Sequence, residues 1–275
     1  MNRSLKLAIS PCPNDTYIFG AWINGLINED PAFKIHAEYY DIQQLNELAR
    51  DESYDLIKIS AAQIKNLRQH YQILTVGAAM GEDNGPLLIS HKWKSGPPSS
   101  LWTIAIPGYD TTAYFLLKHL FPGCIKTTPL LFSKIEDRVM NDHFDAGLII
   151  HESRFTYQSK NLHLIEDLGS LWVNQTGLPI PLGVIAIRRN LDPELKMMIK
   201  IQIQRSLEYA YQHFDKLLPF IKSYAHEMDA QVILDHIRLY VNKYSQEIGP
   251  LGKKAICFLN QLPTEPNDEH LELFI

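Results

Sequence analysis

One histidine stands where a proton acceptor would serve a reaction, directly after a wholly apolar segment. His151 follows residues 146–150, Ala-Gly-Leu-Ile-Ile, and Glu152 comes next. Imidazole is the side chain best suited to proton transfer near neutral pH. At the carboxyl end of a strand it would face the region where α/β proteins bind their ligands. A structural histidine with satisfied hydrogen bonds would explain the same residue equally well.

Hydroxyl groups at two expected helix starts are placed to hold an anion such as a carboxylate. Ser60 ends an apolar segment that also contains Lys58, and residues two apart on a strand share one face. Thr111 and Thr112 begin a second expected helix shortly after Gly108. Helix N-termini present free backbone N–H groups that favour anions, and a lysine in an apolar strand is costly without a partner. Plain helix caps, and a lysine that reaches solvent, are the alternatives.

A third candidate is the loop that follows the first expected strand. Positions 10–16 read Ser-Pro-Cys-Pro-Asn-Asp-Thr. The two prolines favour a rigid turn, and Asn14, Asp15 and Thr16 are all residues that can cap the helix after it. The pattern fits a loop that lines a cleft, and it fits a simple helix cap.

The composition excludes several function classes. The chain has 275 residues, of which 45% are hydrophobic and 21% charged, and its formal net charge is −5. No block of lysines and arginines is present, which disfavours nucleic acid as a partner. No stretch approaches the ~20 apolar residues of a membrane span, and the first apolar run is too short for a secretory signal. We therefore expect a cytoplasmic protein without membrane or nucleic-acid partners.

Cofactor signatures are missing from the sequence. Cys12, Cys124 and Cys257 are widely separated, so neither a disulfide framework nor a cysteine zinc site is expected. There is no glycine-rich nucleotide motif, no phosphate-binding loop and no His-Glu-x-x-His metal motif. The expectation is a protein that uses no metal and no other cofactor.

The elements that must position these residues alternate between strands and helices. Short apolar segments predict strands at 5–10, 33–40, 55–59, 73–79, 86–90, 103–106, 126–131, 146–150 and 179–187. Helical patterns lie at 16–26, 42–50, 60 onward, 111–120, 133–141 and from 192 to about 262. Asp192-Pro193 is a good start signal for the last region. The alternation predicts an α/β fold with largely parallel sheets.

A cluster of glycine, proline and serine at 94–100 separates two blocks of this alternation. No long linker suggests two independent domains, so we expect the second block to be inserted into the first. The first lobe would comprise residues 1–92 and 186–275, and the second lobe residues 93–185. Segments 86–90 and 181–187 would be the paired crossings, with a ligand cleft between the lobes.

Two motifs carry a resemblance to a known family. The loop at 10–16, together with Gly-Leu-Ile-Ile-His-Glu-Ser-Arg-Phe-Thr-Tyr at 147–157, resembles the 1,4-dihydroxy-6-naphthoate synthases. These are the cyclic dehypoxanthinyl futalosine lyases of the futalosine route to menaquinone. Further similar stretches lie at 77–79, 85–88, 107–113, 167–169, 176–183 and 236–242, so the resemblance covers nearly the whole chain. Tyr109 and Asp110 depart mildly from the family pattern.

The resemblance implies a type II periplasmic-binding-protein fold that works as a cytoplasmic, cofactor-independent carbon–carbon lyase. The reaction would convert cyclic dehypoxanthinyl futalosine, a small carboxylated substrate, into 1,4-dihydroxy-6-naphthoate and dihydroxyacetone. The proton acceptor of the family falls on His151. Its substrate-binding segments fall on Lys58, Ile59 and Ser60, and on Thr111 and Thr112.

Three other functions fit the same fold. A chorismate dehydratase is also free of cofactors and belongs to the same pathway, but the motifs at 10–16 and 147–157 favour the lyase. A non-catalytic solute-binding protein that feeds a transporter would need export from the cytoplasm. A ligand-sensing regulatory domain would need a DNA-binding segment, and the sequence shows none.

Overall fold

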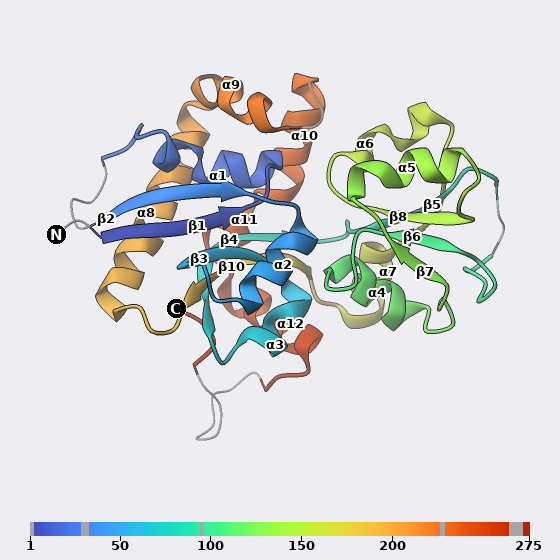
Figure 1. Ribbon diagram of the computed structural model, residues 1–275, viewed down its shortest axis with the longest axis horizontal. Helices are drawn as coiled ribbons and strands as arrows, with labels where there is room; N and C mark the ends of the chain where they lie inside the picture. The colour runs from blue at the N-terminus through green and yellow to red at the C-terminus, as the bar shows by residue number, and fades with distance from the viewer. Residues whose placement is uncertain (1–2, 29–32, 94–95, 226–228, 264–271) are drawn as a thin grey trace.

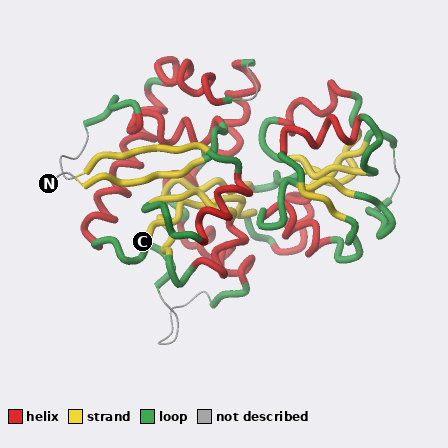
Figure 2. The backbone as a smooth tube through the Cα atoms, viewed as in Figure 1, coloured by secondary structure: helices red, strands yellow, loops and turns green. Residues whose placement is uncertain are grey.

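Two five-stranded sheets, each in its own lobe, form the framework of the protein (Figures 1 and 2). The computed structural model describes residues 3–28, 33–93, 96–225, 229–263 and 272–275. The first sheet has the strand order β2-β1-β3-β10-β4, and the second has the order β7-β6-β8-β5-β9. This confirms the expected α/β fold with two lobes.

The strands of the first sheet are β1 (Arg3–Ile9), β2 (Phe33–Tyr39), β3 (Leu56–Ser60), β4 (Tyr71–Gly81) and β10 (Ile180–Arg188). The strands of the second sheet are β5 (Leu87–Ser90), β6 (Ile104–Ile106), β7 (Thr127–Pro129), β8 (Ala146–Ile149) and β9 (His163–Asp167). Both sheets are mixed, because β10 runs antiparallel to β3 and β4, and β5 runs antiparallel to β8 and β9. The expectation of largely parallel sheets is wrong for the strands next to the lobe crossings, since each of these strands enters its sheet from the other lobe.

The helices of the first lobe are α1 (Pro13–Ile23), α2 (Ile42–Arg50), a 3-10 turn (Ala61–Gln63), α3 (Ile64–Leu67), α8 (Pro193–Gln212), α9 (Phe214–Tyr224), α10 (Ala230–Tyr240), α11 (Lys243–Gln246) and α12 (Gly249–Asn260). Those of the second lobe are α4 (Thr112–Leu120), α5 (Phe132–Met140), α6 (Ser153–Thr156), a 3-10 turn (Tyr157–Lys160) and α7 (Leu168–Thr176). Asp192 caps α8 and Pro193 is its first residue, as the sequence predicted. Across the described residues, no helix combines the length and hydrophobicity that crossing a lipid bilayer would require.

The chain crosses between the lobes at residues 82–86 and again at 177–179. Strand β5 belongs to the second sheet and β10 to the first, so neither strand is itself a crossing. The boundaries expected at 92/93 and 185/186 therefore lie about six residues too late at both crossings. Apolar strand segments look alike whichever sheet they join, and for this reason the sequence pattern did not separate the crossing from the strand that follows it.

Helices cover both faces of the first sheet, so β3, β4 and β10 are almost wholly buried, whereas the edge strand β2 alternates between exposed and half-buried residues. Leu5, Leu7 and Ile9 pack in one cluster with residues of α1, α8 and α10, while Ala8 and Ile57 pack in another with α2 and α12. The latter cluster continues without a break into α4, α7 and one face of the second sheet. The two lobes therefore share one apolar core at their junction.

Polar contacts also join the two lobes. The loop before α4 reaches the first lobe through Asp110, whose carboxylate contacts Arg50 at 2.5 Å and accepts from Gln43 at 2.9 Å. The backbone oxygen of Asp110 accepts from the side-chain amides of Asn46 and Gln63. One loop residue of the second lobe thus joins α2 and the turn after β3.

We expect Asp110→Ala to shift the protein toward an open arrangement, because it removes the ion pair with Arg50 and the bond from Gln43. Small-angle X-ray scattering of the free protein should show a larger radius of gyration than the wild type has. Asp235→Ala removes an ion pair contained within α10 and serves as the control. An unchanged radius for Asp110→Ala would show that apolar packing alone keeps the lobes together.

Candidate active site

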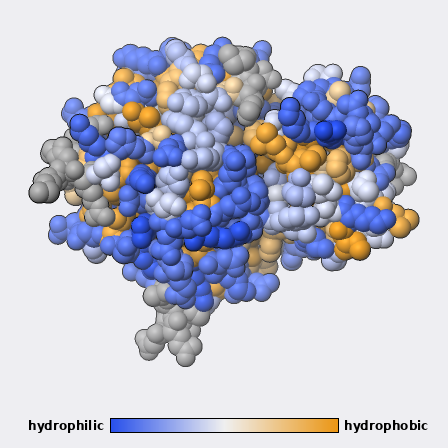
Figure 3. Space-filling view, in the orientation of Figure 1, coloured by the Kyte–Doolittle hydropathy of each residue, from blue (hydrophilic) through white to orange (hydrophobic). Residues whose placement is uncertain are grey.

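A pocket opens between the lobes, where β1, β3, β6 and β8 all end. About 660 Å³ of space lies between its atoms, a volume that includes solvent at its open mouth. On the face seen in Figure 3, hydrophobic residues gather on the smaller lobe along the seam between the lobes. The wall is formed by Ser10, Asn14, Asp15, Ile42, Lys58, Ser60, Ala79, Pro86, Thr111, Thr112, Ala113, Ile150, His151, Leu182, Gly183, His236 and Tyr240.

Two of the residues expected at the site lie outside this wall. Ile59 is completely buried, because alternate residues of β3 face opposite sides of the sheet and its side chain joins the apolar core. Thr16 is also buried, within α1, and its hydroxyl donates to the backbone oxygen of Cys12. A direct contact of either side chain with a ligand is therefore wrong for this structure.

A buried ion pair joins the loop at 10–16 to β3. Lys58 Nζ donates to Asp15 Oδ1 at 2.9 Å, and both side chains are almost fully buried. Asp15 also accepts from the hydroxyl of Ser10 at 2.7 Å and from Asn14 Nδ2 at 2.9 Å. Gly183 makes room for the pair, since a Cβ there would lie 2.8 Å from Cε of Lys58. The charge of Lys58 is thus balanced inside the protein, which corrects the expectation that this lysine is free to bind an anion.

Ser60 does not cap a helix. Its hydroxyl accepts from Asn46 Nδ2 at 2.9 Å, and its backbone N–H donates to Asn46 Oδ1 at 2.8 Å. In the described part of the chain no residue accepts the hydroxyl hydrogen of Ser60. Because Ser60 lines the pocket, this hydrogen is available to a bound anion.

The two threonines are already bonded within the protein. Thr111 is the N-cap of α4, since its hydroxyl accepts from Tyr114 N at 3.2 Å. The hydroxyl of Thr112 donates to the backbone oxygen of Leu182 at 2.9 Å and accepts from Ala62 N at 3.3 Å. Both hydroxyl hydrogens are thus donated within the protein, to Gly108 O by Thr111 and to Leu182 O by Thr112, and a ligand contact of either hydroxyl stays a prediction. Thr112 joins the lobes, and α4 offers the pocket its N-terminal backbone N–H groups.

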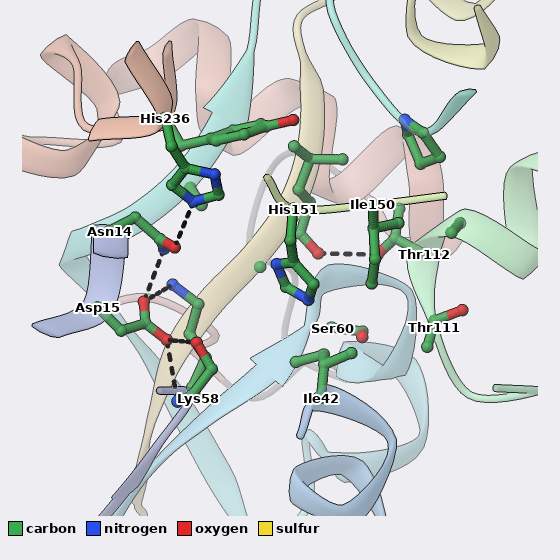
Figure 4. Close-up of a pocket in the computed structure, with 17 residues that line it drawn as sticks. Asn14, Asp15, Ile42, Lys58, Ser60, Thr111, Thr112, Ile150, His151 and His236 are labelled. Atoms are coloured by element: carbon green, nitrogen blue, oxygen red, sulfur yellow. Dashed lines mark hydrogen bonds and ion pairs between the residues drawn. The ribbon is translucent and has the colours of Figure 1, made fainter. Parts of the chain in front are cut away.

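His151 lies in the turn after β8 with a backbone φ of 61°, in the left-handed region that few residues other than glycine adopt. Its Nδ1 is 3.2 Å from the sulfur of Cys12, and the ring of Phe132 packs edge-on at 4.6 Å. Figure 4 shows the opposite edge of the imidazole directed into the pocket, toward Ser60 and Ile42. With an Nδ1–H donated to the sulfur, Nε2 would be the basic nitrogen of the ring.

Cys12, His151 and Glu152 bring three potential metal ligands within 4.8 Å of one another. Sulfur binds metals as the thiolate. Burial, followed by the nearby charge of Glu152, raises the pKa of Cys12 well above its usual value. The thiol form is therefore strongly favoured, and it suits a hydrogen-bond partner of His151 better than a metal ligand.

His236 and Tyr240, both on α10, complete the wall on the side of the loop at 10–16. His236 is 1% exposed, and its Nε2 lies 3.1 Å from Asn14 Oδ1. Burial, and to a smaller extent His151, lowers the pKa of His236 well below its ordinary value. Burial raises the pKa of Tyr240 to about 12. Neither residue was predicted to line the site from its residue type. Their only signal in the sequence was that the stretch at 236–242 resembles the family.

Two lobes with a ligand pocket between them define the class of periplasmic-binding-protein-like folds. A solved protein from Archaeoglobus fulgidus is similar with a TM-score of 0.88 and 29% identity, over 94% of this chain and 96% of that one. The periplasmic aliphatic sulphonate binding protein of Escherichia coli has a TM-score of 0.64 at 11% identity, over 95% and 88% of the two chains. At that identity the second likeness concerns the fold alone.

The sequence profile described as menaquinone biosynthesis matches residues 5–263, and the chain belongs to this family. A 1,4-dihydroxy-6-naphthoate synthase of Thermus thermophilus is 37% identical over 259 residues, which cover 94% of this chain and 93% of that protein. A synthase of the same name from Streptomyces coelicolor is 34% identical, over 92% and 90% of the two chains.

We expect Asp15→Asn to lower the free energy of unfolding by about 3–5 kcal/mol, because it leaves the buried charge of Lys58 without an opposite charge. Urea denaturation measures the change. Adding Lys58→Met to this variant removes the unpaired charge and should recover much of the loss. Asp142→Asn, which breaks an exposed pair with Lys92, is the control and should cost less than about 1 kcal/mol. Equal costs for Asp15→Asn and the control would refute the role of the buried pair.

Proposed function

We propose that the protein is a carbon–carbon lyase that converts cyclic dehypoxanthinyl futalosine into 1,4-dihydroxy-6-naphthoate and dihydroxyacetone. One observation carries the proposal. An imidazole, that of His151, is held in the pocket between the lobes with one ring nitrogen against Cys12 and its other edge toward the ligand space. The similarity to two synthases of this name supports the choice of substrate.

The carboxylate of the substrate would bind on the side of the pocket where donors are free. The hydroxyl hydrogen of Ser60 and the backbone N–H groups at the start of α4 both face this region. Charge-assisted hydrogen bonds of this kind are stronger than those between neutral groups. Lys58 would act indirectly, through the Asp15 network that holds the loop at 10–16 in place.

His151 would then remove a proton from the bound substrate, the ring would open, and the sugar-derived carbons would leave as the aromatic diol forms. Formation of the aromatic ring supplies driving force, so the protein needs chiefly positioning, a base and exclusion of water. Ile42, Ile150 and Leu182 give the pocket an apolar wall around the imidazole. The closed lobes would keep bulk water from the reacting atoms.

A non-catalytic solute-binding protein is the second candidate, since proteins that bind sulfonates share the fold. Binding without turnover would favour it. The lyase proposal also places the protein in the cytoplasm. The buried free thiols of Cys12, Cys124 and Cys257 are in keeping with a reducing compartment.

We expect His151→Asn to fold and bind the substrate, because asparagine tolerates the left-handed backbone and the carboxylate contacts lie elsewhere. Turnover of cyclic dehypoxanthinyl futalosine should fall at least ~10²-fold, the loss typical of removing a general base. His143→Asn, at an exposed site, is the matched control and should keep wild-type activity. Near-normal turnover by His151→Asn would assign the base to another residue.

The wild-type rate should rise with pH through a single ionisation, since only the neutral imidazole of His151 accepts a proton. His236 should not contribute to the profile, because its lowered pKa keeps it neutral across the range. Measuring kcat/KM against pH tests this. A rate that falls as pH rises through the histidine range would contradict a histidine base.

We expect turnover to survive exhaustive chelation and desalting, because the thiol of Cys12 is held in the protonated form and the proposed steps are assigned to side chains alone. Residual metal is measured by mass spectrometry beside the rate. A loss of activity that zinc or magnesium restores would overturn the cofactor-independent mechanism.

A further inference from the structure

His236 is a pocket residue that the mechanism above leaves without a role. It lies on α10, next to the loop at 10–16, and its ring is almost fully buried. Its Nε2 contacts Asn14, whereas Nδ1 has no hydrogen-bond partner among the described residues. Buried polar atoms are rarely left unpaired, because an unmade hydrogen bond costs free energy.

A chain of donors and acceptors fixes which proton His236 carries. An ammonium group can only donate, so the Lys58–Asp15 contact requires the carboxylate to accept. Asn14 also contacts Asp15 Oδ1, at 2.9 Å, and it must therefore turn its NH₂ group to the carboxylate. This leaves the amide oxygen of Asn14 facing His236 at 3.1 Å. An amide oxygen only accepts, so Nε2 of His236 must donate.

A neutral imidazole carries one N–H, and in His236 that N–H is at Nε2. Nδ1 therefore has a lone pair and no hydrogen. Burial opposes a second proton, since it lowers the pKa of His236 well below its ordinary value. The ring is thus a fixed acceptor on its Nδ1 side.

Figure 4 shows the direction in which this acceptor lies. The ring edge that carries Nδ1 is turned away from Asn14 and toward the side on which His151 stands. The centroids of the two imidazoles are 6.4 Å apart, and the ring of Tyr240 lies 4.8 Å from that of His236. Ser60, with its free hydroxyl hydrogen, lies on the other side of His151 in the same view. The pocket therefore has a donor side and an acceptor side, with His151 between them.

We propose that Nδ1 of His236 accepts a hydrogen bond from a hydroxyl group on the sugar-derived part of the substrate, and that His236 is a specificity-determining residue. The inference rests on the proposed function for the identity of the substrate. Dihydroxyacetone leaves with two hydroxyl groups, so the substrate carries oxygens on these carbons. An acceptor repels a carboxylate and attracts a hydroxyl, which sets the direction in which the substrate lies across His151.

The affinities of two ligands, measured by calorimetry in the inactive His151→Asn variant, test this contact. His236→Leu removes the acceptor, and it should weaken binding of cyclic dehypoxanthinyl futalosine roughly 3- to 10-fold, the value of one neutral hydrogen bond. It should leave unchanged the binding of 2-naphthoate, which has the carboxylate but no hydroxyl. His236→Asn can place an amide oxygen near the position of Nδ1, and it should recover part of the loss. Equal weakening of both ligands would overturn the inference and make His236 a structural residue.

Nitrogen NMR of ¹⁵N-histidine-labelled protein tests the same contact with His236 intact. In the free His151→Asn protein, Nδ1 should have the shift of an unprotonated nitrogen and Nε2 that of an N–H. Adding the futalosine derivative should move the Nδ1 resonance in the direction of hydrogen-bond acceptance, and adding 2-naphthoate should not. A proton on Nδ1 of the free protein, or no response to bound substrate, would overturn the inference. If the wild type does not bind the substrate, both the proposed function and this inference are overturned. If it binds the substrate normally but Nδ1 does not respond, only this inference is overturned.

Discussion

The buried ion pair between Asp15 and Lys58 is the interaction on which the rest of the site depends. The two residues lie 43 positions apart, at the start of α1 and on β3, and the pair ties the loop at 10–16 to the first sheet. That loop places Cys12 against His151 and Asn14 against His236. A change that breaks the pair would therefore disturb both imidazoles, although neither touches Lys58 in the contacts described above.

The pocket divides its chemistry between its two sides. Ser60 and the start of α4 offer hydrogen-bond donors, the Nδ1 of His236 offers an acceptor, and His151 stands between them. Sulfonate-binding proteins share this two-lobed fold, so the fold by itself does not define a catalyst. The feature that makes this pocket suited to a reaction is an imidazole, that of His151, at the junction of the lobes.

Local patterns in the sequence predicted much of the fold. The short apolar strands, the start of α8 at Pro193 and the insertion of one block into another follow from periodicity and turn residues. The elements β9 and α7 were not predicted, and the segments of β5 and β10 were predicted to be the crossings, whereas each is a strand within a sheet. At the site, His151, Ser60 and Asp15 line the pocket as expected. The partners of these residues were not predictable, because the contact of Lys58 with Asp15, like that of Cys12 with His151, joins segments distant in the sequence.

Direct incubation with cyclic dehypoxanthinyl futalosine tests the central claim that this binding-protein fold catalyses a lyase reaction. The purified, desalted protein is mixed with the substrate, and both 1,4-dihydroxy-6-naphthoate and dihydroxyacetone are quantified by chromatography and mass spectrometry. Both products should appear in equal amounts, over many turnovers, at a rate proportional to the protein concentration. Tight binding of the substrate with neither product formed would contradict it and would identify the protein as a binding protein.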